Sequence, residues 1–423
     1  MSLQSNNEKN VRNLILYFQV HQPKRFKPVK FFDIGNLTDR YDEYVNQSVV
    51  ERVASTCYLP TNALLLKLIK KHPEIKICFS ISGVALDQFA TYTPEVIDSF
   101  RALADTGNVE FLGETYFHSL ASLMSGHEFE IQVLKHAELI ENLFGRRPTF
   151  FRNTELIYND EIGKRAALLG FEGIFTDGVQ QVLRNNKNTH QVYAHPEHAE
   201  LKIMLRDYVL SDDIAFRFVE HGTRLTAEKY INWLNEISPD DNIVTIGMDY
   251  ETFGEHQKKE SGIHDFLKKL LKNLATSESH RLMTPTEAVR TLPVAGKLSV
   301  PKTVSWADHE RDLSAWLGNE MQKDAFDSLA KIERDVKALN DAEITRQWRL
   351  LQTSDHFYYM STKQGSDGSV HTYFSHYPSP YEAFINYMNV LTDFTCQLEK
   401  AQKVAKAKKA KRITKALREL VHA

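Results

Sequence analysis

The stretch IGMDYETFGEH, residues 246–256, places three carboxylates and an imidazole within eight positions. It follows an apolar run rich in Ile, Val and Thr, which is typical of a buried strand. One acid would be enough to cap the helix that the next amphipathic residues predict. The spacing of Asp249 and Glu251, with His256 close behind, therefore indicates a strand end whose polar side chains face a pocket.

A second acidic strand end is FFRNTEL, residues 150–156, which contains Glu155. Carboxylates on two strands of one barrel can face each other, and such a pair suits cleavage of a glycosidic bond. One carboxylate attacks the anomeric carbon, while the other is held protonated and gives its proton to the leaving oxygen. A sugar pocket also needs aromatic and polar groups, and those near the same motifs are His21, Tyr116, Phe117, His118, Tyr250 and Trp316. Among 55 acidic residues, however, spacing alone leaves other enzyme classes open.

The elements that must position these residues alternate along the chain. Short apolar runs without strict alternation are typical of parallel strands that are covered on both faces. They occur at 13–20, 75–82, 108–118, 148–156, 171–178 and 201–210. Amphipathic stretches that predict helices lie between them, at 61–72, 94–107 and 159–170. Because polar residues follow many successive strands, the pattern favours a βα barrel over an open sheet.

The pattern changes near the last third of the chain. Strand-like runs become sparse, and helical periodicity predicts long helices over 324–339 and 381–420. We therefore expect two domains, a barrel over residues 10–300 and a helical bundle over residues 301–423. Trp306 is interpreted as packing between them. The basic segment close to the C-terminus is interpreted as a solvated helix face rather than a nucleic-acid or membrane arm.

Composition narrows the class of protein further. The formal charge of −3 gives no global field that favours nucleic acid or anionic lipid, and three cysteines are too few for a disulfide framework. The polar N-terminus lacks the apolar core of a signal peptide, and no apolar run approaches the ~18 residues of a membrane helix. We therefore expect a soluble, cytoplasmic protein with no nucleic-acid or membrane partner.

Five motifs occur in sequence order. They are HQP (21–23), GNVEFLGETYFHSL (107–120), FFRNTELIY (150–158), MDYETFGEH (248–256) and DLSAWLGNEMQKDAF (312–326). Together they resemble family 57 of the glycoside hydrolases, the group of α-amylases and other α-glucan-acting enzymes. The resemblance implies an α/β fold, namely a distorted seven-stranded (β/α) barrel followed by a C-terminal α-helical bundle that helps to close the active site. It also implies retention of the anomeric configuration.

The resemblance further implies catalytic roles at the matching positions. Glu155 would be the nucleophile and Asp249 the general acid/base, with their carboxyl groups about 5–5.5 Å apart. Arg152 or Asn153 is expected to hold Glu155 ionised by hydrogen bonding. Glu251 is expected to be the negative neighbour that raises the pKa of Asp249.

Substrate-binding residues follow from the same resemblance. His21 and Glu110 match positions near the donor sugar, where a neutral imidazole and a carboxylate can bind hydroxyl groups. His118 and Trp316 are expected to line that subsite, and Asp312 is expected to reach in from the helical domain. Glu251 is also expected to bind substrate. No cofactor and no metal ion is expected.

We therefore predict a retaining, α-amylase-type hydrolase of α-1,4-glucosidic bonds in starch-like polysaccharides or malto-oligosaccharides. The same motifs leave open a 4-α-glucanotransferase or a glucan branching enzyme. A third class is a metal-dependent carbohydrate deacetylase or mannosidase, with Zn²⁺ ligands drawn from Asp249, Glu251, Glu255 and His256. It would leave Glu155 without a role. A non-catalytic glucan-binding protein would keep the aromatic residues but would not need both acids.

Overall fold

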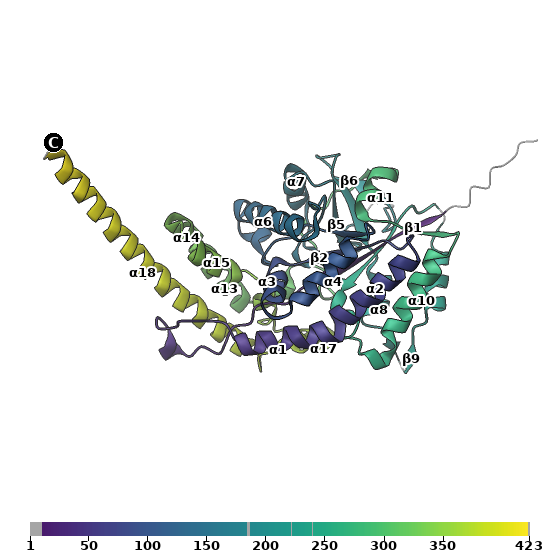
Figure 1. Ribbon diagram of the computed structural model, residues 1–423, viewed down its shortest axis with the longest axis horizontal. Helices are drawn as coiled ribbons and strands as arrows, with labels where there is room; N and C mark the ends of the chain where they lie inside the picture. Colours follow the sequence, from purple (N-terminus) through teal and green to yellow (C-terminus); the bar gives the residue numbers. More distant parts are fainter. Residues whose placement is uncertain (1–10, 184–186, 221, 239, 422–423) are drawn as a thin grey trace, which may run out of the picture. The chain divides into compact units, whose positions relative to one another are not determined.

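The computed structural model describes residues 11–183, 187–220, 222–238 and 240–421 (Figure 1). The segment on which the prediction of no signal peptide rests, residues 1–10, lies outside the described residues. Among the described helices, none combines the length and the apolar sequence needed to cross a membrane.

The chain forms two compact units. The first comprises Met1–Pro23 and Tyr44–Asp312, and the second comprises Lys24–Glu43 and Leu313–Ala423. The change of sequence pattern predicts a division at residue 300, whereas the units divide after Asp312. It also gives no sign that an early segment belongs with the C-terminal helices.

Seven parallel strands of the first unit form the distorted β/α barrel, as predicted. They are β1 (Arg12–Val20), β2 (Ile77–Ile81), β3 (Val109–Phe111), β4 (Phe150–Arg152), β5 (Gly173–Asp177), β7 (Lys202–Arg206) and β10 (Val244–Asp249). Strand β1 pairs with β2 and β10, β2 pairs with β3, and β5 pairs with β4 and β7. The remaining two junctions are narrow, which is why the barrel is distorted.

Single bridges make those two junctions. Gly113, just beyond β3, donates to the Phe150 carbonyl and accepts from the Arg152 N–H, both over 2.8 Å. Strands β7 and β10 are joined by a single residue pair, Arg206 with Thr245. Each junction lies next to a polar residue at a strand end, so the least regular pairing of the barrel adjoins the candidate site.

Strand β1 explains why these runs lack strict alternation. Its last seven residues are all buried, because both faces of a parallel strand are covered. Leu14, Leu16 and Phe18 pack in the outer core with the surrounding helices, whereas Ile15 and Tyr17 pack inside the barrel. The two faces thus contribute to two separate cores.

Helices connect the strands and cover the barrel. They are α1 (Glu43–Val53), α2 (Leu59–Lys71), α3 (Gly83–Tyr92), α4 (Pro94–Ala104), α5 (Ala121–Met124), α6 (Gly126–Phe144), α7 (Asp160–Leu168), α8 (Tyr208–Ala215), α9 (Ala227–Glu236), α10 (Ile263–Ala275) and α11 (Pro285–Thr291). Short strands β6 (Val192–Ala194), β11 (His280–Leu282) and β12 (Val294–Lys297) extend the sheet, and β8 (Val219–Glu220) pairs with β9 (Thr223–Arg224).

The second unit is helical, as predicted. Its helices are α12 (Ser314–Leu317), α13 (Glu320–Lys331), α14 (Glu333–Leu339), α15 (Ala342–Leu350), α16 (Ser354–Tyr358), α17 (Gly365–Phe374) and α18 (Pro380–Val421), the last drawn in yellow in Figure 1. The early segment is tied to α18 by two buried contacts. Arg40 pairs with Asp393 over 2.5 Å, and Asn386 accepts from the Val29 N–H over 2.7 Å.

The bridge at Gly113 yields a test of barrel closure. A Cβ at this position would lie 2.7 Å from the Phe171 ring, so Gly113→Ala should lower the free energy of unfolding by about 1–3 kcal/mol through overpacking. Urea unfolding monitored by circular dichroism measures this loss. Adding Phe171→Leu should recover part of it by removing ring atoms, and a strictly additive double variant would contradict the assigned clash.

Candidate active site

Polar side chains gather at the carboxyl ends of the barrel strands. In a parallel barrel these ends share one rim, where loops build the site. The residues at or just after the ends are His21 (β1), Ser82 (β2), Glu114 (β3), Glu155 (β4), Asp177 (β5), Arg206 (β7) and Asp249 (β10). The strand-end prediction for His21, Glu155 and Asp249 is therefore correct in position.

Glu155 lies in a tight turn directly after β4. The turn Thr154–Leu156 puts Glu155 at φ +57° and Leu156 at φ +50°, in the left-handed region that non-glycine residues seldom adopt. Each carboxylate oxygen then has its own neighbour. The Trp306 indole N–H donates to Oε2 over 2.8 Å, and His118 Nε2 lies 3.2 Å from Oε1. These contacts favour the ionised form of Glu155.

The residues that hold Glu155 differ from those predicted. Arg152 donates to the Asn153 carbonyl over 3.3 Å, and Asn153 donates to Ser122 and to the Ile157 carbonyl. Neither side chain hydrogen-bonds Glu155. Trp306 packs against the core inside the barrel, and its N–H is in addition a direct donor to the carboxylate. The predicted packing of Trp306 between the two domains stays a prediction. A tryptophan 151 residues away from Glu155 in sequence offers no local signal for the role of donor.

His118 bridges two carboxylates. Its Nδ1 lies 3.4 Å from Glu114 Oε2, opposite the contact of Nε2 with Glu155. Burial lowers the pKa of the ring, but the hydrogen bonds and charges of Glu114 and Glu155 outweigh it and raise the pKa to about 10. His21 stacks on this ring at 4.0 Å between centroids, and its Nδ1 lies 2.7 Å from Ser82 Oγ. The structure thus brings His21 and His118 together.

Asp249 is the second carboxyl group of the site. Burial raises its pKa to about 6, and the negative charge of Glu155 adds to the rise. The positive charges of Arg152, His118 and Arg206 act in the opposite direction. The carboxyl group is therefore largely protonated below about pH 6, while its neighbour Glu155 carries charge.

Glu251 is the third acid, and its role differs from the prediction. Burial and the charge of Asp249 raise the pKa of Glu251 to about 8, and the Tyr58 hydroxyl donates to its carboxyl group. Glu251 is consequently neutral where Asp249 begins to ionise. The negative charge that raises the pKa of Asp249 comes from Glu155 instead.

A buried network of two arginines and two aspartates holds Trp306. Arg206 and Arg311 each contact both Asp177 and Asp212, at 2.5–3.3 Å. Arg311 also donates to the Trp306 carbonyl, and the Arg206 guanidinium lies 5.5 Å from the centre of the indole. A second guanidinium, that of Arg152, lies 4.5 Å from the same ring. Cations over an aromatic face are attracted by it, so the indole is restrained near Glu155.

Glu110 does not belong to the group of side chains at the strand ends. Its carboxylate accepts from the N–H of Thr286 over 3.1 Å and from the hydroxyl of the same residue over 2.5 Å, at the start of α11. This carboxylate is partly buried, and its role in binding substrate hydroxyls stays a prediction. In the same motif, the acid that contacts His118 is Glu114, which no sequence pattern had singled out.

The last two predicted residues lie near the division between the units. Asp312 ends the first unit, where its carbonyl accepts from Ser305 Oγ over 2.6 Å. Trp316 belongs to the second unit, where its buried ring lies 6.2 Å from that of Tyr358. Their contribution to a sugar subsite stays a prediction.

The proposed zinc ligands do not converge. Glu255 pairs with Arg52 and accepts from Thr56, whereas Glu251 accepts from Tyr58. Within the part of the chain that the structure describes, Asp249, Glu251, Glu255 and His256 do not form a group with ligand atoms close enough to share an ion.

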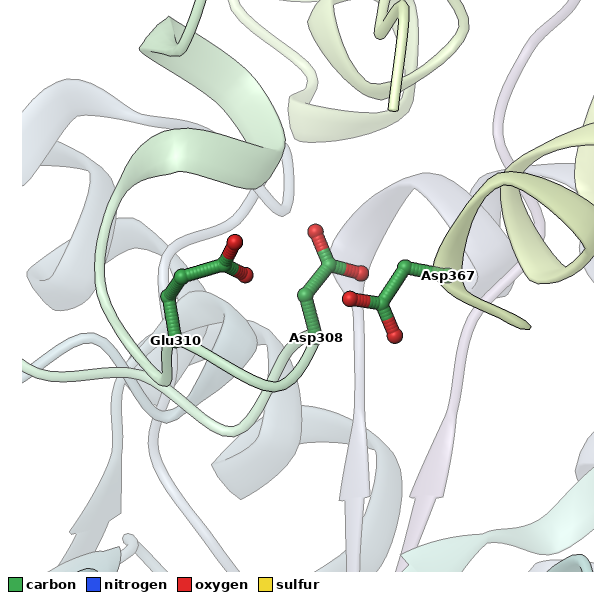
Figure 2. A group of neighbouring side chains, drawn as sticks. All are labelled: Asp308, Glu310 and Asp367. Atoms are coloured by element: carbon green, nitrogen blue, oxygen red, sulfur yellow. The ribbon is translucent and has the colours of Figure 1, made fainter. Parts of the chain in front are cut away.

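Three other acidic side chains are drawn in Figure 2. Asp308 and Glu310 come from the segment after β12 in the first unit, and Asp367 comes from the first turn of α17 in the second. Because they belong to different units and carboxylates at a surface often gather without an ion, we assign no metal site to them.

Two comparisons by sequence show the family of the chain. A family model described as Glycosyl hydrolase family 57 matches residues 15–301. A protein named "Putative alpha-amylase" from Methanocaldococcus jannaschii is 42% identical over 392 residues, covering 89% of this chain and 83% of that protein.

Two solved structures share the fold. The 4-alpha-glucanotransferase from Thermococcus litoralis has a TM-score of 0.63 at 17% identity, over 82% of this chain and 56% of that one. The branching enzyme from Thermococcus kodakaraensis, solved in complex with glucose, has a TM-score of 0.65 at 13% identity, over 86% and 87%. At such identities the likeness concerns the fold alone.

The buried acid Glu251 makes stability depend on pH. Its pKa is about 8 in the folded chain against an ordinary 4.5, so the folded state binds the proton more tightly. This stabilisation is complete below about pH 4.5 and is lost as the pH rises through about 8. Urea unfolding at several pH values should therefore show a steeper decline in the wild type than in Glu251→Gln, which cannot titrate. The exposed Glu161→Gln is the control, and equal slopes for all three proteins would contradict the assignment.

Proposed function

Because the chain belongs to glycosyl hydrolase family 57, we propose that it cleaves α-1,4-glucosidic bonds in starch-like polysaccharides or malto-oligosaccharides with retention of configuration. The observation that carries the proposal is that two acids at one barrel rim have unlike surroundings. Glu155 has a donor at each oxygen, and Asp249 has a pKa of about 6. A glycosidase of this kind needs one carboxylate and one carboxylic acid together.

The first half of the reaction would use the carboxylate of Glu155 and the proton of Asp249. A Glu155 oxygen forms a bond to the anomeric carbon, and the bond from that carbon to the glycosidic oxygen breaks. Asp249 transfers its proton to the departing oxygen, which leaves as a hydroxyl of the shortened glucan. The products of this step are a glycosyl ester on Glu155 and an ionised Asp249.

The second half would restore them. The ionised Asp249 takes a proton from water, and the water oxygen bonds to the anomeric carbon as the ester bond breaks. Two inversions at one carbon give net retention. The donors on Glu155 assist here, because negative charge returns to the carboxylate as it leaves. Trp306 would stabilise Oε2 and His118 would stabilise Oε1 at that moment.

The neighbouring groups would bind sugar hydroxyls. His21 is half-buried at the end of β1, where its ring stacks on that of His118, and an imidazole can donate to or accept from a sugar hydroxyl. Glu251, when protonated, can also act as a donor. We assign these two and His118 to the subsite that holds the sugar undergoing attack.

Transfer to a second glucan is the alternative outcome. The printed names of the structural relatives are those of a glucanotransferase and a branching enzyme, whereas the sequence relative is named as an amylase. All three outcomes use the same glycosyl ester and differ in whether water or a sugar hydroxyl takes it. Amylase activity is the version we propose, because the relative named as an amylase shares far more sequence.

Product analysis separates these outcomes. Incubation with maltoheptaose, maltotriose, amylose and pullulan, followed by chromatography, should yield glucose, maltose and other short products. Ladders of longer sugars would instead identify a transferase, and new α-1,6 branches would identify a branching enzyme. Proton NMR at early times should show the α-anomer first. Binding of maltoheptaose without any product would refute catalysis and leave a glucan-binding protein.

Both acids should be essential for turnover. Glu155→Gln and Asp249→Asn should each lower kcat by about a thousandfold or more, because each removes one required step. Aryl α-maltosides, whose leaving group needs little protonation, should partly rescue the first step in Asp249→Asn but not in Glu155→Gln. Circular dichroism verifies folding, and Glu161→Gln on the surface of α7 is the control. Near-normal activity in either variant would remove that residue from its role.

The indole donor offers a subtler test. Trp306→Phe keeps an aromatic ring near the two guanidinium groups but removes the N–H donor to Glu155, so kcat/KM should fall about ten- to a hundredfold. Trp233→Phe on α9, where the indole contacts Lys229 and Tyr230, is the matched control and should keep full activity. An unchanged kcat/KM in Trp306→Phe would return this residue to a packing role.

A further inference from the structure

Glu114 is a fully buried carboxylate that the proposed reaction leaves without a role. Its side chain is 0% exposed, so it cannot touch substrate. Gln19 Nε2 donates to its Oε2 over 3.1 Å, and His118 Nδ1 lies 3.4 Å from the same oxygen. Its own N–H donates to His136 Nδ1 over 3.2 Å, which anchors the backbone. A charge buried so deeply is costly unless it is paired, and the cation available to it by contact is His118.

The His118 ring can satisfy both carboxylates in one protonation state only. Its Nδ1 faces Glu114 and its Nε2 faces Glu155, so acceptor oxygens lie at both nitrogens. A neutral imidazole has one N–H, and its other nitrogen would point a lone pair at a carboxylate. The imidazolium ion donates to both. The backbone of His118, at φ +47°, is held in an uncommon conformation while presenting the ring in this way.

We infer that Glu114 is a positioning residue that keeps His118 doubly protonated. The Nε2–H group of His118 then continues to donate to Glu155 during both halves of the reaction. The inference rests on the proposed function for the role of Glu155. It does not require Glu114 to move or to exchange a proton. The contact that matters is the one between Glu114 Oε2 and His118 Nδ1.

The need for a second carboxylate arises in the covalent intermediate. Once Glu155 is an ester it has lost its negative charge, and the buried imidazolium would lose the counter-ion in contact with its Nε2. Glu114 supplies that counter-ion independently of the state of Glu155. The Nε2 proton is then still in place when the ester breaks and charge returns to the Glu155 oxygen. Without Glu114, the ring would favour its neutral form at the stage where a donor is needed.

Other titratable groups lie near Glu114 and His118 and also act on the protonation of these two side chains. His21 stacks on the His118 ring, and Arg152 and His136 act on the charge of Glu114. Burial lowers the pKa of His136, and its Nε2 lies 2.8 Å from the Ile81 carbonyl, so it is a neutral donor at that atom. The charge of His118 also acts to lower the pKa of Asp249. None of these groups lies between His118 and Glu114.

The test compares Glu114→Gln with a matched variant, Glu128→Gln. Glu128 is equally buried and supports the same loop, since it accepts from Gln132, which in turn accepts from Ser119. Glu128→Gln therefore reports the effect of loosening the loop, while the carboxylate that contacts His118 is kept. Two measurements are made on the full-length wild type and both variants: the ¹⁵N NMR shifts of the histidine rings as a function of pH, and kcat and KM for maltoheptaose between about pH 5 and 8.

Wild-type His118 should be doubly protonated up to pH 8, as should His118 in Glu128→Gln. In Glu114→Gln it should lose a proton below that pH. Relative to wild type, kcat of Glu114→Gln should fall by about ten- to a hundredfold at pH 8 and much less at pH 5, where solvent protonates the ring, with KM nearly unchanged. Glu114→Asp, which keeps the charge, should reduce this dependence on pH.

Each contrary result is distinguishable. A neutral His118 in the wild type at pH 8 overturns the inference even if Glu114→Gln does not fold. A loss in Glu114→Gln that is independent of pH and equal to that of Glu128→Gln assigns Glu114 a structural role only. Failure of the wild type to release any product from maltoheptaose refutes the proposed function instead, and the NMR result for His118 would still stand by itself.

Discussion

The negative charge of Glu155 is the constraint on which the rest of the barrel rim depends. An ionised carboxylate in a half-buried turn needs donors, and the indole of Trp306 and the ring of His118 supply one for each oxygen. The same charge, together with burial, raises the pKa of Asp249 to about 6. Two acids of similar intrinsic strength therefore differ in protonation because one is hydrogen-bonded and the other is not compensated to the same extent.

Compensation of charge extends well beyond these two acids. Arg206 and Arg311 pair with Asp177 and Asp212 in a buried network, and the two arginines also hold the ring or the carbonyl of Trp306. Buried ion pairs contribute little net stability, because desolvation offsets most of their attraction. Their value here is geometric, since they restrain an indole whose N–H must point at one oxygen. In this network the polar interactions therefore fix the position of a side chain more than they stabilise the fold.

Local sequence predicted the elements and the strand-end acids because both depend on short-range patterns. The buried run of β10 ends at Asp249 and that of β4 ends just before Glu155, and parallel strands must bring such ends to one rim. Glu110 was placed near the donor sugar by the family resemblance alone, and in the structure its carboxylate accepts from Thr286. Three residues beyond the short strand β3, a neighbouring acid, Glu114, contacts His118.

The sequence alone determined the family, the barrel and the two acids at the strand ends, since composition, strand periodicity and motif order are properties of the chain itself. Only the tertiary structure decided which groups control the protonation of those acids. Trp306 is 151 residues away from Glu155 in sequence, and Glu114 reaches it through the ring of His118. No local pattern encodes such contacts, because a pKa depends on burial and on charges that meet only when the barrel closes.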